Sequence, residues 1–176
     1  KDLIIHAHLM VKNPHSQTES KLSTIEEYLE AGVTNIALHQ NAFNSEKEFI
    51  KSINFIRDNN CTPGIIIDIA NNELEKIWSF IKLHKINWVV IMGVPIGYGG
   101  QLFQPNALSK ISFFREKSDS EDYNLEIEVD GGLNIDNIKD CYMMGANILA
   151  GWSIIKDKTA KDVVKKYKNI LNLVKS

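Results

Sequence analysis

The sequence has little of what marks secreted, membrane or nucleic-acid-binding proteins. Its two cysteines, Cys61 and Cys141, lie far apart and in no metal or redox spacing, which indicates free thiols in a reducing compartment. No apolar run approaches the length of a membrane span, and no signal-peptide pattern is present. The net charge of -2 at pH 7 leaves no basic excess for nucleic acid or an anionic membrane. We therefore predict a cytoplasmic protein that binds neither.

The sequence also lacks a starting methionine, and an apolar segment follows Lys1 within two residues. The composition is that of an ordinary globular chain, because 44% of the residues are hydrophobic and 24% are charged. A chain of 176 residues can bury a substantial core in one domain. We expect residues 1–176 to form a single domain.

Short, nearly all-apolar segments alternate with segments of helical periodicity along the chain. We expect strands at 3–11, 35–39, 64–68, 87–92, 125–130 and 147–150. Helices are expected at 20–31, 46–59, 72–83, 106–115, 135–144 and 160–174, with a polar connection at 118–122. This alternation predicts an α/β fold with a parallel sheet covered by helices, either a doubly wound open sheet or a (β/α)8 barrel. Polar residues end nearly every strand, which favours the barrel because an open sheet concentrates its site at one switch point.

The strand at 125–130 ends in a carboxylate and two glycines. Its period of two places apolar residues on one face and three acids, the last of them Asp130, on the other. Such a face suits the inside of a barrel with a site at its mouth. Gly131 and Gly132 leave room there for a ligand or another backbone. The alternative is an edge strand that ends in an Asp-Gly turn.

Histidines and a glycine-rich loop are further candidates for a site. His8 and His6 lie on the same face of the first strand, where a histidine is usually a core residue. A His-x-His pair is also typical of metal sites in amidohydrolase-type barrels, although those chains are longer and need more ligands. His15 and His84 are expected to be solvated surface residues. Residues 93–100 would offer backbone N–H groups to a phosphate, or would form a plain flexible loop.

Three motifs, in this order, resemble the ribulose-phosphate 3-epimerase family. They are His-Leu-Met-Val-Lys-Asn-Pro at 8–14, Gly-Tyr-Gly-Gly-Gln-Leu-Phe-Gln-Pro at 97–105, and Val-Asp-Gly-Gly at 129–132. The resemblance implies an α/β (β/α)8 TIM barrel in which the first strand of this chain is the family's third. Residues 1–176 would then resemble strands 3 to 8, and the family's first two βα units, roughly 50 residues, would be absent from this sequence.

The resemblance also implies an isomerase of pentose phosphate metabolism, an epimerase of the ribulose 5-phosphate/xylulose 5-phosphate type. Two aspartates exchange the C3 proton, assisted by one divalent metal ion, which could be Zn, Fe, Mn or Co. Asp130 would be one catalytic aspartate and a metal ligand, and His8 another ligand. The second aspartate and a further histidine would belong to an absent strand. The partner would be a phosphorylated ketose, with a homo-oligomer possible.

The same resemblance implies a pocket for the substrate and its phosphate, formed by thioether side chains and glycine-rich loops. Its expected residues are His8, Met10, Met92, Gly97, Tyr98, Gly99, Gly100, Gly131, Gly132, Gly151 and Trp152. Core packing explains the two methionines equally well.

Four positions depart from the family's usual pattern. Residues 95–97 are Pro-Ile-Gly instead of Asn-Pro-Gly, and Trp152 stands where a serine follows the phosphate-binding glycine. Asn41 replaces a glutamate, and Asp68-Ile69 replaces Asn-Pro. These changes keep two alternatives open: a barrel that binds a sugar phosphate without catalysis, and an epimerase of another ketose phosphate.

Overall fold

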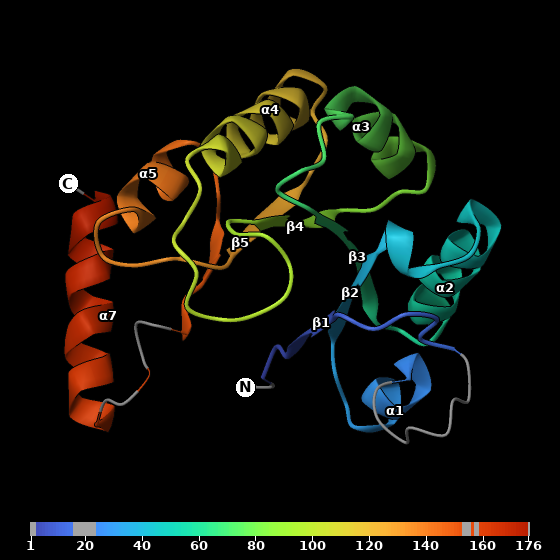
Figure 1. Cartoon of the computed structure of the whole chain (residues 1–176), viewed down its shortest axis with the longest axis horizontal. Coiled ribbons are helices and arrows are strands. Elements are labelled where there is room, and N and C mark those ends of the chain that lie inside the picture. Colours follow the sequence, from blue (N-terminus) through green and yellow to red (C-terminus); the bar gives the residue numbers. More distant parts are fainter. Residues whose placement is uncertain (1–2, 16–23, 153–155, 157–158, 176) are drawn as a thin grey trace. The chain divides into compact units, whose positions relative to one another are not determined.

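The computed structural model describes residues 3–15, 24–152, 156 and 159–175, and strands and helices alternate along them (Figure 1). The strands of this part are β1 (His6–Leu9), β2 (Asn35–His39), β3 (Thr62–Ile67), β4 (Trp88–Met92), β5 (Glu126–Asp130) and β6 (Ile148–Ala150). The helices are α1 (Ile25–Glu30), α2 (Glu46–Asp58), α3 (Leu74–Leu83), α4 (Asn106–Ser120), α5 (Ile138–Met143) and α7 (Ala160–Lys175), with a 3₁₀ turn η1 (Gln40–Ala42). The predicted alternation is confirmed for these residues.

The strands form one sheet in the order β1-β2-β3-β4-β5-β6. The pairs β1–β2, β2–β3 and β5–β6 are parallel. A doubly wound sheet reverses its strand order at a switch point, whereas here spatial order follows chain order throughout. The sheet is therefore wound in the manner of a barrel, and the doubly wound alternative is wrong.

The chain divides into two compact units. Unit 1 comprises Lys1–Ile66 and Phe80–Val89, and unit 2 comprises Ile67–Ser79 and Val90–Ser176. Each functional group of residues described below lies within one unit.

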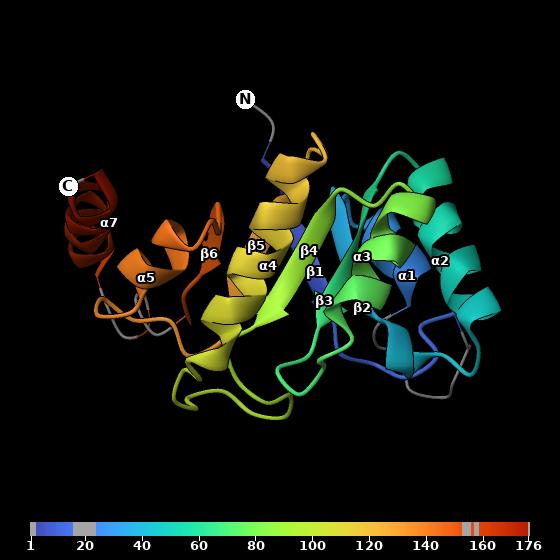
Figure 2. The ribbon, with the colours of Figure 1, turned by 90° about the horizontal axis from the view of Figure 1, so that it is seen from above.

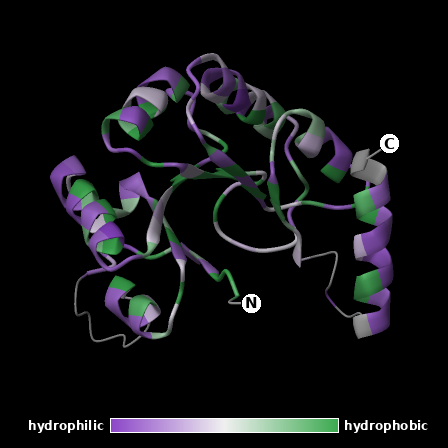
Figure 3. Cartoon of the chain, turned by 180° about the vertical axis from the view of Figure 1, so that it is seen from behind, coloured by the Kyte–Doolittle hydropathy of each residue, from purple (hydrophilic) through white to green (hydrophobic). Residues whose placement is uncertain are grey.

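In unit 1, helix α2 begins where the sequence predicts it. The Ser45 hydroxyl accepts a hydrogen bond from the backbone N–H of Glu48 at 3.2 Å, which satisfies a donor at the helix start. The helix buries Phe49, Ile53 and Ile56 completely, and each contributes about 1.5–3 kcal/mol of apolar burial. Figure 3 shows polar and apolar residues alternating around helices such as α2 and α7. Among the described residues, no helix combines the length and apolar character needed to span a membrane.

In unit 2, helix α4 is longer than the sequence predicts. It continues to Ser120, so the expected polar connection at 118–122 is wrong for its first residues. Two side-chain contacts hold this end of the helix: the Ser118 hydroxyl donates to the carbonyl of Tyr123, and the Arg115 guanidinium donates to the carbonyl of Gly145, thirty residues further along, at 3.1 Å. Both acceptors lie beyond the helix, which is why local periodicity could not show where it ends.

The last elements of unit 2 pack as a helix pair beside a short strand. Helices α5 and α7 contact each other, and Figure 2 shows α5 between α7 and β6. Gly145 follows α5 at a φ of +108°, a conformation that favours glycine after a helix. The predicted end of this helix at Gly145 is confirmed.

Burial of Cys141 in α5 links stability to pH. Desolvation, helped by the negative charge of Asp140, raises the pKa of the Cys141 thiol from 9.0 to about 11. The folded chain therefore favours the neutral thiol. The resulting contribution to the free energy of unfolding is complete below pH 9 and is lost as the pH rises towards 11.

Two variants isolate this effect: Cys61→Ala, which keeps Cys141, and the double variant Cys61→Ala, Cys141→Ala, which lacks it. As the pH is raised from 8 to 10.5, we expect the free energy of unfolding to fall by about 2 kcal/mol more in the single variant than in the double variant. The first substitution removes the other buried thiol, whose pKa burial also raises. Urea denaturation of both variants at each pH measures the difference. Parallel losses in the two variants would show that Cys141 does not couple to folding.

Candidate functional site

In unit 1, two histidines on neighbouring strands face each other. His8 lies on β1 opposite Ala37 of β2, and His39 follows two positions later on the same face of β2. The two Nε2 atoms are 3.1 Å apart. His39 is only 5% exposed, so this pair of imidazoles lies at the buried end of β2. The sequence reasoning singled out His8 and missed His39 as its partner.

His6 has a different environment from His8. Its ring packs against the indole of Trp88, with 4.7 Å between ring centroids. In the His-x-His pair, His6 therefore contacts an aromatic ring, whereas His8 contacts His39.

In unit 2, Asp130 ends β5 beside the start of the glycine-rich loop. Its backbone carbonyl accepts a hydrogen bond from the N–H of Gly93 at 2.7 Å. The carbonyl of Gly93 in turn accepts from the N–H of Gln104 at 2.8 Å. Both ends of the loop at 93–104 are therefore held next to Asp130 by backbone hydrogen bonds, which do not depend on side-chain identity.

Three glycines and one phenylalanine pack beside Asp130. We call this group the glycine junction: Gly93, Gly131, Gly132 and Phe103. A Cβ on Gly93 would lie 2.3 Å from the carbonyl oxygen of Gly131, and one on Gly132 would lie 2.6 Å from the backbone nitrogen of Phe103. Both separations are too short for real atoms. Only glycine lets the two loops approach this closely, which confirms the prediction that another backbone comes near the glycines after β5.

The middle of the glycine-rich loop is exposed. Gly97, Gly99 and Gly100 have no atoms near the position of an added Cβ, and Tyr98 is 75% exposed. The Gln101 amide donates to the carbonyls of Pro95 at 2.7 Å and Tyr98 at 2.9 Å, and so closes the loop on itself. The loop has the open backbone expected of an anion-binding segment.

A cavity of about 700 Å³ lies in unit 2 next to the end of β5. It brings together three of the predicted site residues: Asp130, Gly151 and Trp152. The remaining lining comes from α5, β6 and α7 and their neighbours: Ile138, Tyr142, Asn147, Leu149, Ala150, Val163, Tyr167, Ile170 and Leu171. Trp152 is 69% exposed, so its indole lies at the surface of the cavity. Glycines 97–100 do not line it.

The two predicted thioether residues differ in burial. Met92 is only 2% exposed and belongs to the core strand β4, whereas Met10 follows β1 and is 52% exposed. Packing accounts for Met92, while Met10 is accessible.

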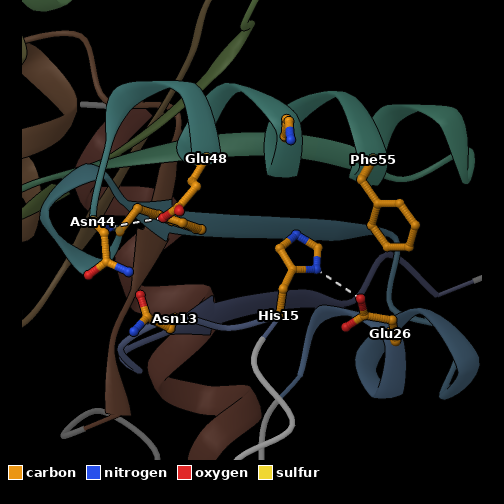
Figure 4. A pocket seen from close by; sticks show the side chains of 8 residues that line it. Asn13, His15, Glu26, Asn44, Glu48 and Phe55 are labelled. Carbon is orange, nitrogen blue, oxygen red and sulfur yellow. Dashed lines mark hydrogen bonds and ion pairs between the residues drawn. The ribbon is translucent and has the colours of Figure 1, made fainter.

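A second cavity, of about 580 Å³, lies in unit 1 near α1 and α2 and contains His15 (Figure 4). The His15 ring contacts Glu26 through Nδ1 at 2.8 Å and meets the Phe55 ring edge to face. His15 is a surface residue, as predicted, and its side chain, 35% exposed, also has two specific partners. Glu26 lies eleven residues further along the chain, so local sequence patterns could not predict that it contacts His15.

The described residues contain no group of three or more His, Cys, Asp or Glu side chains that could hold a metal ion. The His8–His39 pair brings together two such side chains.

The sequential strand order and the functional residues after several strands define a β/α protein of the barrel class. A family model for the ribulose-phosphate 3 epimerase family matches residues 1–155. The chain belongs to this family of isomerases.

Two curated relatives show how much of the family's length the chain spans. It is 30% identical over 175 residues to a ribulose-phosphate 3-epimerase of Buchnera aphidicola subsp. Acyrthosiphon pisum, covering 98% of this chain and 70% of that protein. It is 28% identical over 156 residues to the Escherichia coli (strain K12) ribulose-phosphate 3-epimerase, covering 88% of this chain and 63% of that protein.

Among solved structures, the chain resembles 3-keto-L-gulonate-6-phosphate decarboxylase from Vibrio cholerae with a TM-score of 0.59. The match covers 97% of this chain and 74% of the other at 11% identity. This likeness concerns the fold alone.

Proposed function

We propose that the protein is a ketose-phosphate 3-epimerase that interconverts ribulose 5-phosphate and xylulose 5-phosphate. The observation that supports this best is the position of Asp130: it ends β5 beside the glycine junction and lines a cavity together with Gly151. In a parallel β/α protein, residues after the strands form the active site.

The proposed reaction requires a proton to leave C3 on one face of the substrate and another to arrive on the opposite face. The carbonyl at C2 makes the C3 proton acidic enough for a carboxylate base. Asp130 would remove or deliver the proton on one face. The backbone N–H groups of the loop at 97–100 and of Gly131 and Gly132 would bind the phosphate, because they offer donors without side chains in the way.

The family resemblance also implies one divalent metal ion, Zn, Fe, Mn or Co, with His8 and Asp130 among its ligands. Imidazole and carboxylate groups suit these metals, so the two side chains fit the role chemically. When bound, such an ion would stabilise negative charge that develops on the substrate oxygens.

We also propose that both units belong to one barrel domain, in which the six strands correspond to strands 3 to 8. The shares of 70% and 63% that the chain covers of two relatives support this correspondence. In this proposal the second aspartate comes from outside the residues described here. A homo-oligomer remains compatible with the proposal.

Isotope exchange tests the reaction directly. We expect the protein, with added divalent metal, to convert ribulose 5-phosphate in D₂O into the epimer carrying one deuterium at C3, detected by NMR. The label enters because the proton removed on one face is replaced from solvent on the other. Binding of the sugar phosphate without any exchange would instead support a non-catalytic barrel.

Trp152 supports a second candidate function, that of an epimerase of another ketose phosphate. A large, exposed indole lines the Asp130 cavity where the family usually has serine. If it selects a different ketose phosphate, then a six-carbon ketose phosphate will exchange faster than ribulose 5-phosphate in the same experiment. Equal or slower exchange of the six-carbon sugar would exclude this alternative.

A further inference from the structure

We propose that the unit 1 cavity beside His15 binds a linear aliphatic diamine, with Glu26 and Glu48 accepting hydrogen bonds from its two ammonium groups. All the described residues that line this cavity lie in unit 1. None of them is among the proposed active-site residues, so the inference goes beyond the proposed function.

The cavity has the size and the lining of a small-molecule site. Its volume of about 580 Å³ lies within the range of roughly 300–1,000 Å³ that is typical of ligand pockets. Helices α1 and α2 supply its two carboxylates, and Phe43 and Phe55 supply aromatic rings. In Figure 4 the carboxylates of Glu26 and Glu48 lie on either side of the His15 ring. The lining thus combines two separate acceptor groups with apolar surface.

The Glu26 carboxylate has capacity for a further hydrogen-bond donor. Its Oε1 atom accepts from Nδ1 of His15 at 2.8 Å. Its Oε2 atom is buried and has no hydrogen-bond partner within the described part of the chain. A buried acceptor without a partner keeps its full desolvation cost, and this cost is larger for a charged group. Because the last torsion of a glutamate side chain is soft, a rotation of the carboxylate presents this oxygen to a donor in the cavity.

His15 and Glu48 offer acceptors as well. A carboxylate accepts hydrogen bonds only, so the proton of a neutral His15 lies on Nδ1, next to Glu26, and Nε2 is left as an acceptor. The Glu48 Oε2 atom accepts from the backbone N–H of Asn44 at 3.2 Å. This carboxylate can accept further bonds, because its two oxygens have about four lone-pair sites. An ammonium group has three donors and no acceptor, and is therefore complementary to both acidic side chains.

The charge of the lining also favours a cation. Glu26 and Glu48 are formally negative, and Lys51 is the one lysine or arginine among the described lining residues. The resulting net negative charge attracts cations and repels anions. The Phe55 ring is a favourable surface for an ammonium group and for an aliphatic chain. A linear diamine has an ammonium group at each end of an apolar stem, so one molecule matches both carboxylates.

An anion held by Lys51 and a doubly protonated His15 is the competing account of the same cavity. It predicts that inorganic phosphate binds and that Lys51→Gln abolishes this binding. The diamine account predicts the opposite effect of that substitution: removal of a positive charge from the lining strengthens diamine binding. The two accounts are therefore separated by one variant and two ligands.

The test is a calorimetric titration of the protein with three compounds that share a four-carbon stem. 1,4-Diaminobutane, 1-aminobutane and 1,4-butanediol carry two, one and no ammonium groups, and inorganic phosphate is the fourth ligand. The buffer contains no amine and about 0.15 M NaCl, which screens weak attraction to exposed charges. The backbone amide NMR signals of Asn13, His15 and Asn44, which line the cavity, show where the diamine binds.

We expect 1,4-diaminobutane to bind about 10-fold more tightly than 1-aminobutane, and 1,4-butanediol not to bind. Glu26→Gln and Glu48→Gln should each weaken diamine binding by about 10- to 100-fold, the usual effect of losing a hydrogen bond between charged groups. Glutamine keeps the shape of glutamate and can accept the bonds from His15 and Asn44. The matched control is Glu46→Gln, which removes the same charge from an exposed position of α2 and should leave binding unchanged.

Several results would overturn the inference. They are equal affinity for the three four-carbon compounds, a loss in Glu46→Gln as large as in Glu26→Gln, and phosphate binding that Lys51→Gln abolishes. A lysine-containing peptide that binds at the cavity when the diamine does not would overturn it in favour of a protein partner. Thermal unfolding shows which variants are folded, and the ligand series on the unchanged protein decides if a variant is not. None of these measurements uses a ketose phosphate, so the proposed function can fail while this inference stands, and the reverse.

Discussion

Replacement of Asp130 by asparagine is expected to lower epimerisation of ribulose 5-phosphate by about 10²- to 10⁴-fold, the usual effect of losing a group that transfers a proton in the transition state. Asparagine has nearly the same shape as aspartate, but its amide cannot accept and return the C3 proton. The fold should not change, because the hydrogen bond from Gly93 ends on the backbone carbonyl of Asp130 and not on its side chain. A coupled assay of the protein with added divalent metal measures the loss.

A matched substitution shows whether the effect is specific. Asp136→Asn removes the same charge from an exposed position six residues along the chain, in the same unit. We expect its turnover to remain within a factor of two of that of the unchanged protein. If Asp130→Asn retains a tenth or more of the activity, then another residue removes the proton, and Asp68 is the next to substitute.

Most of the secondary structure could be predicted because its determinants are local. The strand at 35–39 has the predicted bounds, and helix α2 begins at the predicted Glu46 after its Ser45 cap. The first strand is shorter than predicted, since only His6–Leu9 pair with β2. An apolar run indicates which residues can be buried, but pairing with a neighbour decides how many of them form the strand.

The candidate site could be predicted only where one segment carries the signal. Asp130, Gly131 and Gly132 are consecutive, and the sequence alone predicts that they follow a buried strand. The contacts of Phe103 and His39 could not be predicted, because they join segments roughly 30 residues apart in the chain. Such contacts follow from strand order and register, which periodicity does not specify.

The same limit explains the alternatives that the sequence left open. The order of the strands in the sheet, and not their number or length, excluded the doubly wound fold. For His6, the ring of Trp88 supplies an aromatic contact from a strand about 80 residues later. A side chain's chemistry is visible in the sequence, whereas its partner is a property of the fold.

Gly132 is the position where a single methyl group is expected to cost most stability. Its φ is +70°, where a residue with a side chain is strained by about 1–2 kcal/mol. A Cβ there would also lie 2.6 Å and 2.7 Å from the backbone nitrogen and Cα of Phe103. These are backbone atoms, so relief requires the loop at 93–104 to move and not merely a side chain to rotate.

We therefore expect Gly132→Ala to lower the free energy of unfolding by about 2–5 kcal/mol, the sum of the backbone strain and the usual 1–3 kcal/mol for overpacking. Urea denaturation of the chain followed by circular dichroism measures the change. The matched control is Gly99→Ala, because Gly99 lies in the same unit at an ordinary φ with nothing within 4 Å of an added Cβ. Its effect should stay within about 0.5 kcal/mol, as for other open surface positions. If the two substitutions cost the same, then the close approach of Gly132 to Phe103 does not exist in solution, and the loop is not held beside Asp130 by the glycine junction.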